Sequence, residues 1–447
     1  MSRVWHFLAA FLVLLAFALL CDAKLWRPRD VFTIAENIQI AEAQAWWQGK
    51  LDLPERKWDS ALYNGKVYSH FPPLFSFLSA LITPFYNGVP HWFVVLIVVL
   101  PTPILGNLLF RRLSGSAVWG ATLAFGLVCG TSSLPVLEKT LRGAGPYFVN
   151  QALALTGVLI FLREYFGKQR WALAGAGVVM AAWSRQMTVA YLLAFAWMIL
   201  RSVAPAGASG GRSSANQGLR FAPPLATNLA PSGGRTGAVD FRGSHTSKRW
   251  ATACVALTIF FAIGVPMGMN WLKFGSPLES GYMHVYEGRS DDVFAKDARE
   301  HGIFSLAYVP RNLYYSTLGT WSLQPIKRGN EYEWHLSPQL WGTGILWTTP
   351  LIVFVFFDLR GILTDPKRRM LLLAAGLAYI GLMVYHSTGY KQRGYNRYSL
   401  DYLPVLFALA VPAAMASPWR KAVTVMLIAW SVGYFAFVRH WPQIRIW

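Results

Sequence analysis

The polar segment 22–73 follows the first apolar run of the chain and contains Asp30, a carboxylate suited to acid–base chemistry. Asp30 precedes the stretch 31–47, in which apolar residues recur at helical spacing and predict an amphipathic helix. In such a helix Asp30, Thr33 and Asn37 would share one face. One interpretation makes Asp30 a general base at a membrane surface. The other makes it the N-terminal cap of the helix, followed by ordinary solvated charges.

The end of this segment, residues 63–73, reads Tyr-Asn-Gly-Lys-Val-Tyr-Ser-His-Phe-Pro-Pro. Its Asn-Gly pair predicts a tight hairpin turn. The two prolines lead into Leu74–Tyr86, an apolar stretch that is too short to span a bilayer and predicts an interfacial helix. A structural hairpin would explain the turn but not the whole string. Three of its residues are candidate substrate-binding residues: Tyr63, Tyr68 and His70.

A second polar region, residues 270–338, is dense in tyrosine and tryptophan. Near its start lies Ser-Pro-Leu-Glu-Ser-Gly-Tyr, which adds Glu279 and Tyr282 to the candidate substrate-binding residues. Aromatic faces with polar edges suit sugar rings, which present C–H patches and hydroxyls. The alternative explanation is the aromatic belt that membrane proteins place at the bilayer interface.

Basic residues occur in two short turns on the side where the expected topology disfavours positive charge. These are Arg185, Lys391, Arg393 and Arg397. A cation retained there suits a specific anion such as a lipid phosphate, so all four are candidate phosphate-binding residues. The alternative is that these side chains snorkel to lipid headgroups. Asp401, one helical turn past Arg397, would offer that arginine a salt bridge instead.

The composition indicates a membrane protein. Of the 447 residues 54% are hydrophobic and 14% are charged, well below the ~25% charged residues of a soluble domain. The net charge of +20 does not indicate nucleic-acid binding, because the surplus basic residues lie in short loops between apolar runs. This distribution places the N-terminus in the cytoplasm and the C-terminus outside.

We predict an all-α integral membrane protein with about 11 transmembrane helices and two extracytoplasmic polar regions that carry short interfacial helices. The expected spans are residues 5–21, 91–110, 116–135, 148–163, 170–184, 186–200, 250–269, 339–357, 370–386, 399–416 and 421–438. Residues 1–200 form an N-terminal transmembrane half with a catalytic outer loop, 22–90. A disordered basic cytoplasmic linker, 201–249, separates it from a C-terminal half, 250–447, whose outer loop is 270–338.

The order of these motifs resembles the GT-C superfamily of multi-span glycosyltransferases, which includes the protein mannosyltransferase and aminoarabinose transferase-like proteins of bacterial membranes. The motifs are the early Asp, Gly-x-x-Tyr-Ser-x-x-Pro-Pro, Arg-Arg-Leu after the next span, a mid-chain Ser-Arg turn, Asn-x5-Ser-Pro-Leu-Glu-x-Gly-Tyr and a late Arg-Tyr-x-Leu-Asp-x-Leu-Pro. The resemblance covers most of the chain outside 203–247. It implies a polyprenyl-phosphate sugar donor, an acceptor on the outer side and Asp30 as the base.

The chain departs from the pattern of this superfamily at two positions. Many members carry an acidic pair near the start of the first loop, where this chain has Asp30 alone. Many also carry a lysine directly before Pro-Pro, where this chain has Phe71. Lys66 and His70 are the nearby residues that would take the place of that lysine.

The resulting hypothesis is a glycosyltransferase of the bacterial cytoplasmic (inner) membrane. It would move a sugar from a polyprenyl-phosphate donor to a lipid, glycan or protein acceptor at the extracytoplasmic face, and its other partners would be membrane lipids. No cofactor is expected, and a single candidate carboxylate gives little support to a divalent metal. The hypothesis requires Asp30, Arg185 and Arg397 to converge on one pocket.

Two other classes of function are alternatives to this hypothesis. A multi-span transporter or lipid flippase for glycan precursors would carry ionisable residues inside its spans and show internal symmetry. A membrane scaffold without catalytic activity would need no clustered cavity at the membrane surface.

Overall fold

The computed structural model describes residues 2–21, 30–33, 37–57, 59–143, 145–203, 245–287, 293–328, 331–339, 341–387 and 394–440. Two predicted phosphate-binding residues, Lys391 and Arg393, lie outside these ranges, as does most of the predicted linker 201–249. The described chain is mostly helical and contains three small antiparallel two-stranded sheets.

The N-terminal half is built from ten α-helices and two hydrogen-bonded strand pairs. The helices are α1 (Ser2–Cys21), α2 (Ile38–Trp47), α3 (Leu74–Tyr86), α4 (His91–Val94), α5 (Pro101–Ser114), α6 (Ala117–Cys129), α7 (Ser133–Gly143), α8 (Pro146–Tyr165), α9 (Trp171–Ala182) and α10 (Tyr191–Val203). The strands are β1 (Val31–Phe32), which pairs with β4 (Val89–Pro90), and β2 (Ser60–Tyr63), which pairs with β3 (Lys66–Ser69).

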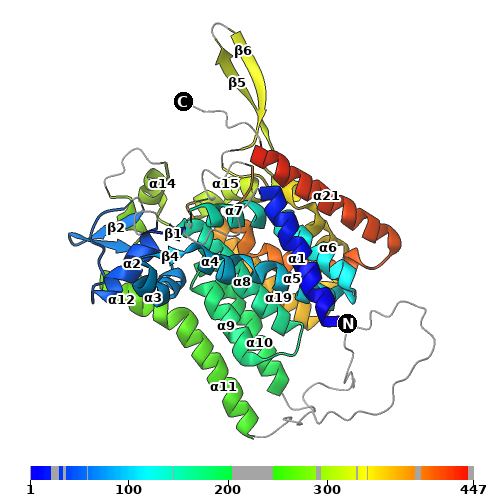
Figure 1. Ribbon diagram of the computed structural model, residues 1–447, viewed down its shortest axis with the longest axis horizontal. Coiled ribbons are helices and arrows are strands. Elements are labelled where there is room, and N and C mark those ends of the chain that lie inside the picture. Colours follow the sequence, from blue (N-terminus) through cyan, green and yellow to red (C-terminus); the bar gives the residue numbers. More distant parts are fainter. Residues whose placement is uncertain are drawn as a thin grey trace.

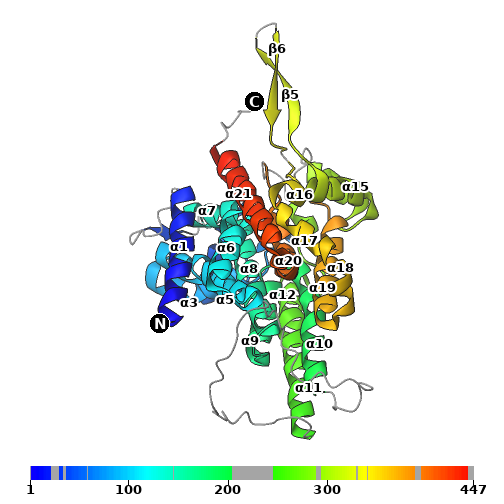
Figure 2. The same ribbon diagram turned by 90° about the vertical axis from the view of Figure 1, so that its right-hand side faces the viewer.

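The C-terminal half repeats the pattern of helices linked by short turns. Its helices are α11 (His245–Ile259), α12 (Val265–Phe274), α13 (Tyr282–Val285), α14 (Val293–His301), α15 (Val309–Leu313), α16 (Ile345–Thr348), α17 (Val353–Phe357), α18 (Leu359–Thr364), α19 (Pro366–Met383), α20 (Leu403–Ala414) and α21 (Pro418–His440). Strands β5 (Ser322–Arg328) and β6 (Glu331–Ser337) form a hairpin. This hairpin projects from one end of the molecule, whereas α10 and α11 reach toward the other end (Figures 1 and 2).

Five helices of the described chain are long and apolar enough to cross a membrane. They comprise residues His91–Ser114, Pro146–Tyr165, Gln186–Val203, Arg249–Phe274 and Pro418–Val438. A sixth would be α6 and α7 taken together, which are bent by 62° at their junction. The mostly helical fold is confirmed, while the count of 11 spans stays a prediction. The expected span 339–357 is divided between α16, a short 3₁₀ turn and α17.

Two local predictions, a hairpin turn in the first polar segment and an apolar helix directly after it, are confirmed. Asn64 and Gly65 both adopt positive φ, 50° and 73°, and join β2 to β3 as a two-residue hairpin turn. The predicted apolar helix Leu74–Tyr86 is α3, with the same bounds.

The predicted helix from Asp30 onward is wrong in its first part. Val31 and Phe32 are extended and pair with β4, and α2 begins only at Ile38. Asn37 caps α2, since its side chain accepts the N–H of Gln39 at 2.8 Å. Asp30 is therefore not the helix cap. Its backbone oxygen accepts the N–H of His91 at 2.9 Å, which extends the β1–β4 pairing by one residue.

Helix α8 lies in the main hydrophobic core and is buried along nearly its whole length. It packs closely on α9, where Gly157 faces Gly177. A Cβ atom added to Gly157 would come within 2.6 Å of the Gly177 carbonyl oxygen, so neither position has room for a side chain.

A buried ion pair joins the two polar regions of the chain. The Lys273 ammonium at the end of α12 contacts the Glu42 carboxylate of α2 and also donates to the carbonyl of Ser69 at 2.9 Å. The Ser76 hydroxyl of α3 donates to the other Glu42 oxygen. Glu42 is fully buried and Lys273 is 6% exposed. The pair thus fixes the second polar region against the β2–β3 hairpin.

We expect Glu42→Gln to lower the free energy of unfolding by about 3–5 kcal/mol, because it leaves the Lys273 ammonium buried without its counter-charge. Denaturant titration in detergent micelles measures this loss. Lys66→Met is the matched control: Lys66 is 60% exposed and lies 3.9 Å from Asp52, so its removal changes stability by less than about 1 kcal/mol. Equal effects of the two substitutions would contradict the structural role of the buried pair.

Candidate functional site

A cavity of about 400 Å³ lies where the two polar regions meet the helical core, and we call it the site cavity. Its described lining residues are Asp59, His70, Phe71, Pro72, Lys139, Tyr147, Phe148, Asn150, Ser184, Arg185, Tyr282, Val285, Tyr286, Phe294, Tyr385, His386, Ser387, Arg397 and Tyr398. They come from the β2–β3 region, the α7–α8 and α9–α10 connections, α13, α14 and the segment between α19 and α20. In Figure 1, α7 and α14 lie toward the β5–β6 end of the molecule.

Four predicted site residues meet in this cavity: His70, Arg185, Tyr282 and Arg397. His70 and Tyr282 lie edge to face, with ring centroids 4.6 Å apart. Of the two residues considered as replacements for the missing lysine, His70 lines the cavity. Lys66 is largely exposed and is not among the lining residues.

Four other predicted site residues are not among those that line the cavity: Asp30, Tyr63, Tyr68 and Glu279. Both tyrosines pack on Phe274, with ring centroids 5.8 and 5.5 Å away. Glu279 accepts the N–H of Gly281 at 2.7 Å. Asp30 is exposed beside the start of α4. The predicted convergence of Asp30, Arg185 and Arg397 thus holds for the two arginines alone.

Arg185 forms a two-point ion pair with Asp401, whose carboxylate is fully buried. Its Nε lies 3.2 Å from both carboxylate oxygens, and its NH2 group lies 3.0 Å from Oδ2. The Gln151 amide donates to Asp401 Oδ1 at 2.9 Å. Asp401 therefore pairs with Arg185 and not with Arg397, the partner considered from the sequence. The reason is that 397–401 forms a 3₁₀ turn, in which residues four apart do not share a face.

Arg397 is a buried cation surrounded by aromatic rings. It is 6% exposed, and its guanidinium lies 4.6 Å from the Tyr147 ring centroid and 5.2 Å from that of Tyr398. Its Nε has no hydrogen-bond partner, and within the described ranges no carboxylate lies at salt-bridge distance from it. Since an uncompensated buried charge is costly, this geometry suits an anionic ligand.

Lys139 places a second positive charge in the site cavity. Its ammonium lies 4.9 Å from the ring centroid of Phe148, a ring that the Arg397 guanidinium also approaches, at 5.5 Å. Both cations line the cavity. They form a positively charged wall that the sequence did not reveal, because Lys139 lies in α7 next to Glu138 and resembles an ordinary solvated helix charge.

Asp59 is the one acidic residue among the described residues that line the site cavity. It sits directly before β2 with φ at +84°, a conformation that is uncommon outside glycine. The Tyr147 hydroxyl donates a hydrogen bond to its carboxylate. Sequence reasoning missed Asp59, and no motif identifies it. Its position depends on the hairpin folding back onto the start of α8.

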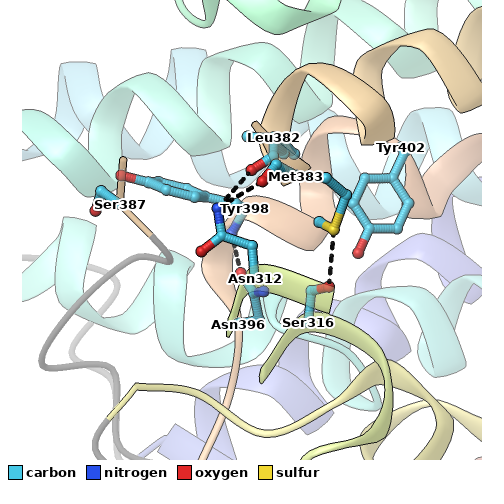
Figure 3. A pocket seen from close by; sticks show the side chains of 8 residues that line it. All are labelled: Asn312, Ser316, Leu382, Met383, Ser387, Asn396, Tyr398 and Tyr402. Atoms are coloured by element: carbon cyan, nitrogen blue, oxygen red, sulfur yellow. Dashed lines mark hydrogen bonds between the residues drawn. The ribbon is translucent and has the colours of Figure 1, made fainter. Parts of the chain in front are cut away.

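A small polar cavity of about 10 Å³ adjoins the site cavity and shares Ser387 and Tyr398 with it (Figure 3). Here the Asn312 amide donates to the carbonyls of Met383 at 2.9 Å and Tyr385 at 2.6 Å. Asn312 thereby satisfies carbonyls at and just beyond the end of α19. This contact fixes the path of the segment that follows α19 into the site.

Among the described residues no group of three or more His, Cys, Asp or Glu side chains is arranged to hold a metal ion. Comparison of the chain with family models, curated proteins and solved structures found no match.

The phenol of Tyr398 lies between the two arginines of the site, with the Arg185 guanidinium 4.4 Å from its ring centroid. Burial raises the pKa of Tyr398, but the charges of Arg397 and Arg185 outweigh burial and lower that pKa below its usual value. The ionised phenol is therefore stabilised in the folded protein. The stability that it contributes is present above the unfolded pKa and is lost as the pH falls through the folded pKa.

We expect Tyr398 to ionise at a lower pH than tyrosines with ordinary pKa values. Ultraviolet difference titration should show an early step, in which one tyrosine ionises at lower pH than the others. This step should be missing from Tyr398→Phe. Arg397→Gln should move that step to higher pH, because it removes the larger of the two lowering charges. Tyr314→Phe is the control, since Tyr314 is exposed and is not among the residues of the site. An early step that survives Tyr398→Phe would contradict the assignment.

Proposed function

We propose that the protein is a glycosyltransferase that moves a sugar from a polyprenyl-phosphate donor to an acceptor hydroxyl. The observation that supports this most is the buried Arg397, which has no carboxylate at salt-bridge distance within the described ranges, beside Lys139 and in the same cavity as the carboxylate of Asp59. Arg397 and Lys139 would bind the phosphate of the donor, and the Asp59 carboxylate would accept the proton of the attacking hydroxyl. Aromatic residues such as Tyr282 and Phe294 supply ring faces suited to a sugar.

In this proposal the protein spans the bacterial cytoplasmic membrane, with its N-terminus in the cytoplasm and its C-terminus outside. Support comes from α8, which runs from Tyr147 in the site cavity to its end next to Phe166. At 1.5 Å per residue this stretch is about 28 Å long, close to the ~30 Å of a bilayer's hydrocarbon core. The site cavity would then open at the extracytoplasmic face.

The proposed reaction is a single displacement at the anomeric carbon. The acceptor hydroxyl attacks that carbon while Asp59 takes its proton, so that a carbon–oxygen bond forms as the bond to the phosphate oxygen breaks. The bonding electrons leave with the polyprenyl phosphate, whose added negative charge Arg397 and Lys139 stabilise. Such a displacement inverts the configuration of the sugar. The phosphate leaves as a stable anion and needs no general acid.

Asp59 takes the role of base in this proposal because it lines the cavity, whereas the resemblance assigns that role to Asp30. The two carboxylates can be separated by experiment. We expect folded Asp59→Asn to lose about 10²–10⁴-fold in turnover, the usual contribution of a general base, and Asp30→Asn to stay near wild type. The measurement is release of polyprenyl phosphate from a labelled polyprenyl-phosphate sugar in membranes that contain native acceptors.

The converse result, with Asp30→Asn inactive and Asp59→Asn active, would keep the transferase and move the base to Asp30. Wild-type protein that releases no polyprenyl phosphate under any acceptor condition would overturn the proposed function.

Arg397 should act mainly in donor binding. We expect Arg397→Gln to raise the donor KM about 10-fold to 150-fold, because a buried hydrogen bond to a charged group contributes about 1.5–3 kcal/mol. Arg142→Gln is the matched control, since Arg142 is 60% exposed and pairs with Glu138 on the same helix as Lys139. The assay is the dependence of turnover on donor concentration. An unchanged KM would exclude Arg397 from the donor phosphate.

A further inference from the structure

A second and larger cavity lies at the opposite end of α8, and we call it the basic cavity. Its volume is about 1050 Å³. It is framed by the end of α5, the α8–α9 connection, the end of α10, the start of α19 and one side of α20. Figure 1 shows the end of α10 directed away from the β5–β6 hairpin, so the two cavities face opposite ends of the molecule.

Four basic side chains and one acidic side chain line the basic cavity. The basic residues are Arg112, Arg201, Lys367 and Arg368, and the acidic one is Asp365. Arg368 is neutralised by Asp358. One Asp365 oxygen accepts the backbone N–H of Lys367 at 2.8 Å and caps α19. In the part of the chain that the structure describes, Arg112, Arg201 and Lys367 have no carboxylate at salt-bridge distance.

Two of these three cations, Lys367 and Arg201, lie beside aromatic rings. The Lys367 ammonium lies 5.3 Å from the Tyr165 ring centroid, and the Tyr165 hydroxyl donates to the Lys367 carbonyl at 2.8 Å. Arg201 lies 5.2 Å from the ring centroid of Trp197. Three cations from three separate helices therefore converge on one space although they repel one another. A multiply charged anion in that space would relieve the repulsion.

The nearby cations and burial change the pKa of Lys367. Burial and the nearby Arg112 and Arg201 lower the pKa of Lys367 to about 8, against the raising effect of Asp365. An anion bound between these groups would raise the pKa of Lys367 again.

We infer that the basic cavity binds a phosphate group, either as the headgroup of an anionic lipid or as a free phosphate compound. The size of the cavity and its mixed lining, which includes apolar side chains from α10 and α20 beside the cations, suit a phosphate attached to an apolar body. This site is separate from the site cavity and does not depend on the proposed transferase activity.

The test measures the thermal unfolding midpoint of the full-length protein in a neutral detergent at pH 7. One arm adds inorganic phosphate against chloride of equal ionic strength. The other adds phosphatidic acid against phosphatidylcholine. A stabilising shift in the first arm identifies a free phosphate as sufficient, and a shift confined to the second identifies the lipid headgroup. Either shift supports the site, and no shift in either arm overturns it.

Charge-removing variants assign the shift to this cavity. Lys367→Gln and Arg201→Gln should each abolish most of it. Arg369→Gln should keep it, because Arg369 is exposed on the same helix and is not among the lining residues. If Arg369→Gln loses as much as Lys367→Gln, or if neither cavity variant loses the shift, the assignment is wrong.

A pH series remains informative even for variants of low stability. Because the pKa of Lys367 is lowered to about 8, the affinity of the wild-type protein for the phosphate probe should fall between pH 7 and pH 9 relative to the affinity of Lys367→Gln. The ratio of the two affinities removes the titration of the phosphate probe itself. A ratio that is constant over this range would contradict a role for Lys367 as a ligand.

Discussion

The ion pair between Arg185 and Asp401 joins the two halves of the chain at the site cavity. These residues are 216 positions apart. Asp401 is fully buried, and the Arg185 side chain is 17% exposed where it lines the cavity. The Gln151 amide and the Arg185 guanidinium satisfy the Asp401 carboxylate, and the Tyr191 hydroxyl donates to the Asp401 carbonyl at 2.6 Å. Three parts of the bundle, α8, the α9–α10 connection and the start of α20, are thereby fixed beneath the site cavity. Removing either charge would leave the other buried and uncompensated.

This pairing also decides which arginine remains for a ligand. Asp401 is close to Arg397 in sequence, but the 3₁₀ turn directs its carboxylate toward Arg185. Arg397 is left among aromatic rings, which stabilise a cation without neutralising it. The same turn therefore pairs Arg185 with a carboxylate and leaves Arg397, among the residues that the structure describes, without one. The sequence alone treats the two arginines as equivalent.

Signals that are local in the sequence predicted local structure well. The Asn-Gly turn needs only two residues that tolerate positive φ, and α3 needs only an apolar stretch that follows Pro72 and Pro73. The start of α2 was misplaced because Val31 and Phe32 pair with β4, nearly 60 residues further along the chain. The spacing of apolar residues along 31–47 cannot reveal a partner strand so far along the chain. Val and Phe also suit the extended conformation as well as a helix.

The site depends on contacts that no local pattern encodes. Asp59 reaches the cavity because the β2–β3 hairpin folds onto the start of α8, and Lys139 reaches it because α7 bends by 62° away from α6. Arg185 and Arg397 were found from the sequence because basic residues in short outer turns between apolar runs are unusual, and His70 and Tyr282 because they lie in distinctive polar and aromatic strings of the two outer regions. A charged residue on a helix, such as Lys139, is common in any sequence and does not by itself indicate a site.

The two cavities place different chemistry at the two ends of α8. The site cavity combines Arg397 and Lys139, which have no carboxylate at salt-bridge distance among the described residues, with the Asp59 carboxylate and many aromatic rings. It can therefore hold an anion and also accept a proton. The basic cavity has an excess of cations, and the one acid that lines it caps a helix, so its chemistry is that of binding. Between them Gly157 and Gly177 bring the backbones of α8 and α9 into direct contact. The two helices leave no room for a side chain at this crossing, and the sugar transfer proposed for the site cavity would require no passage through it.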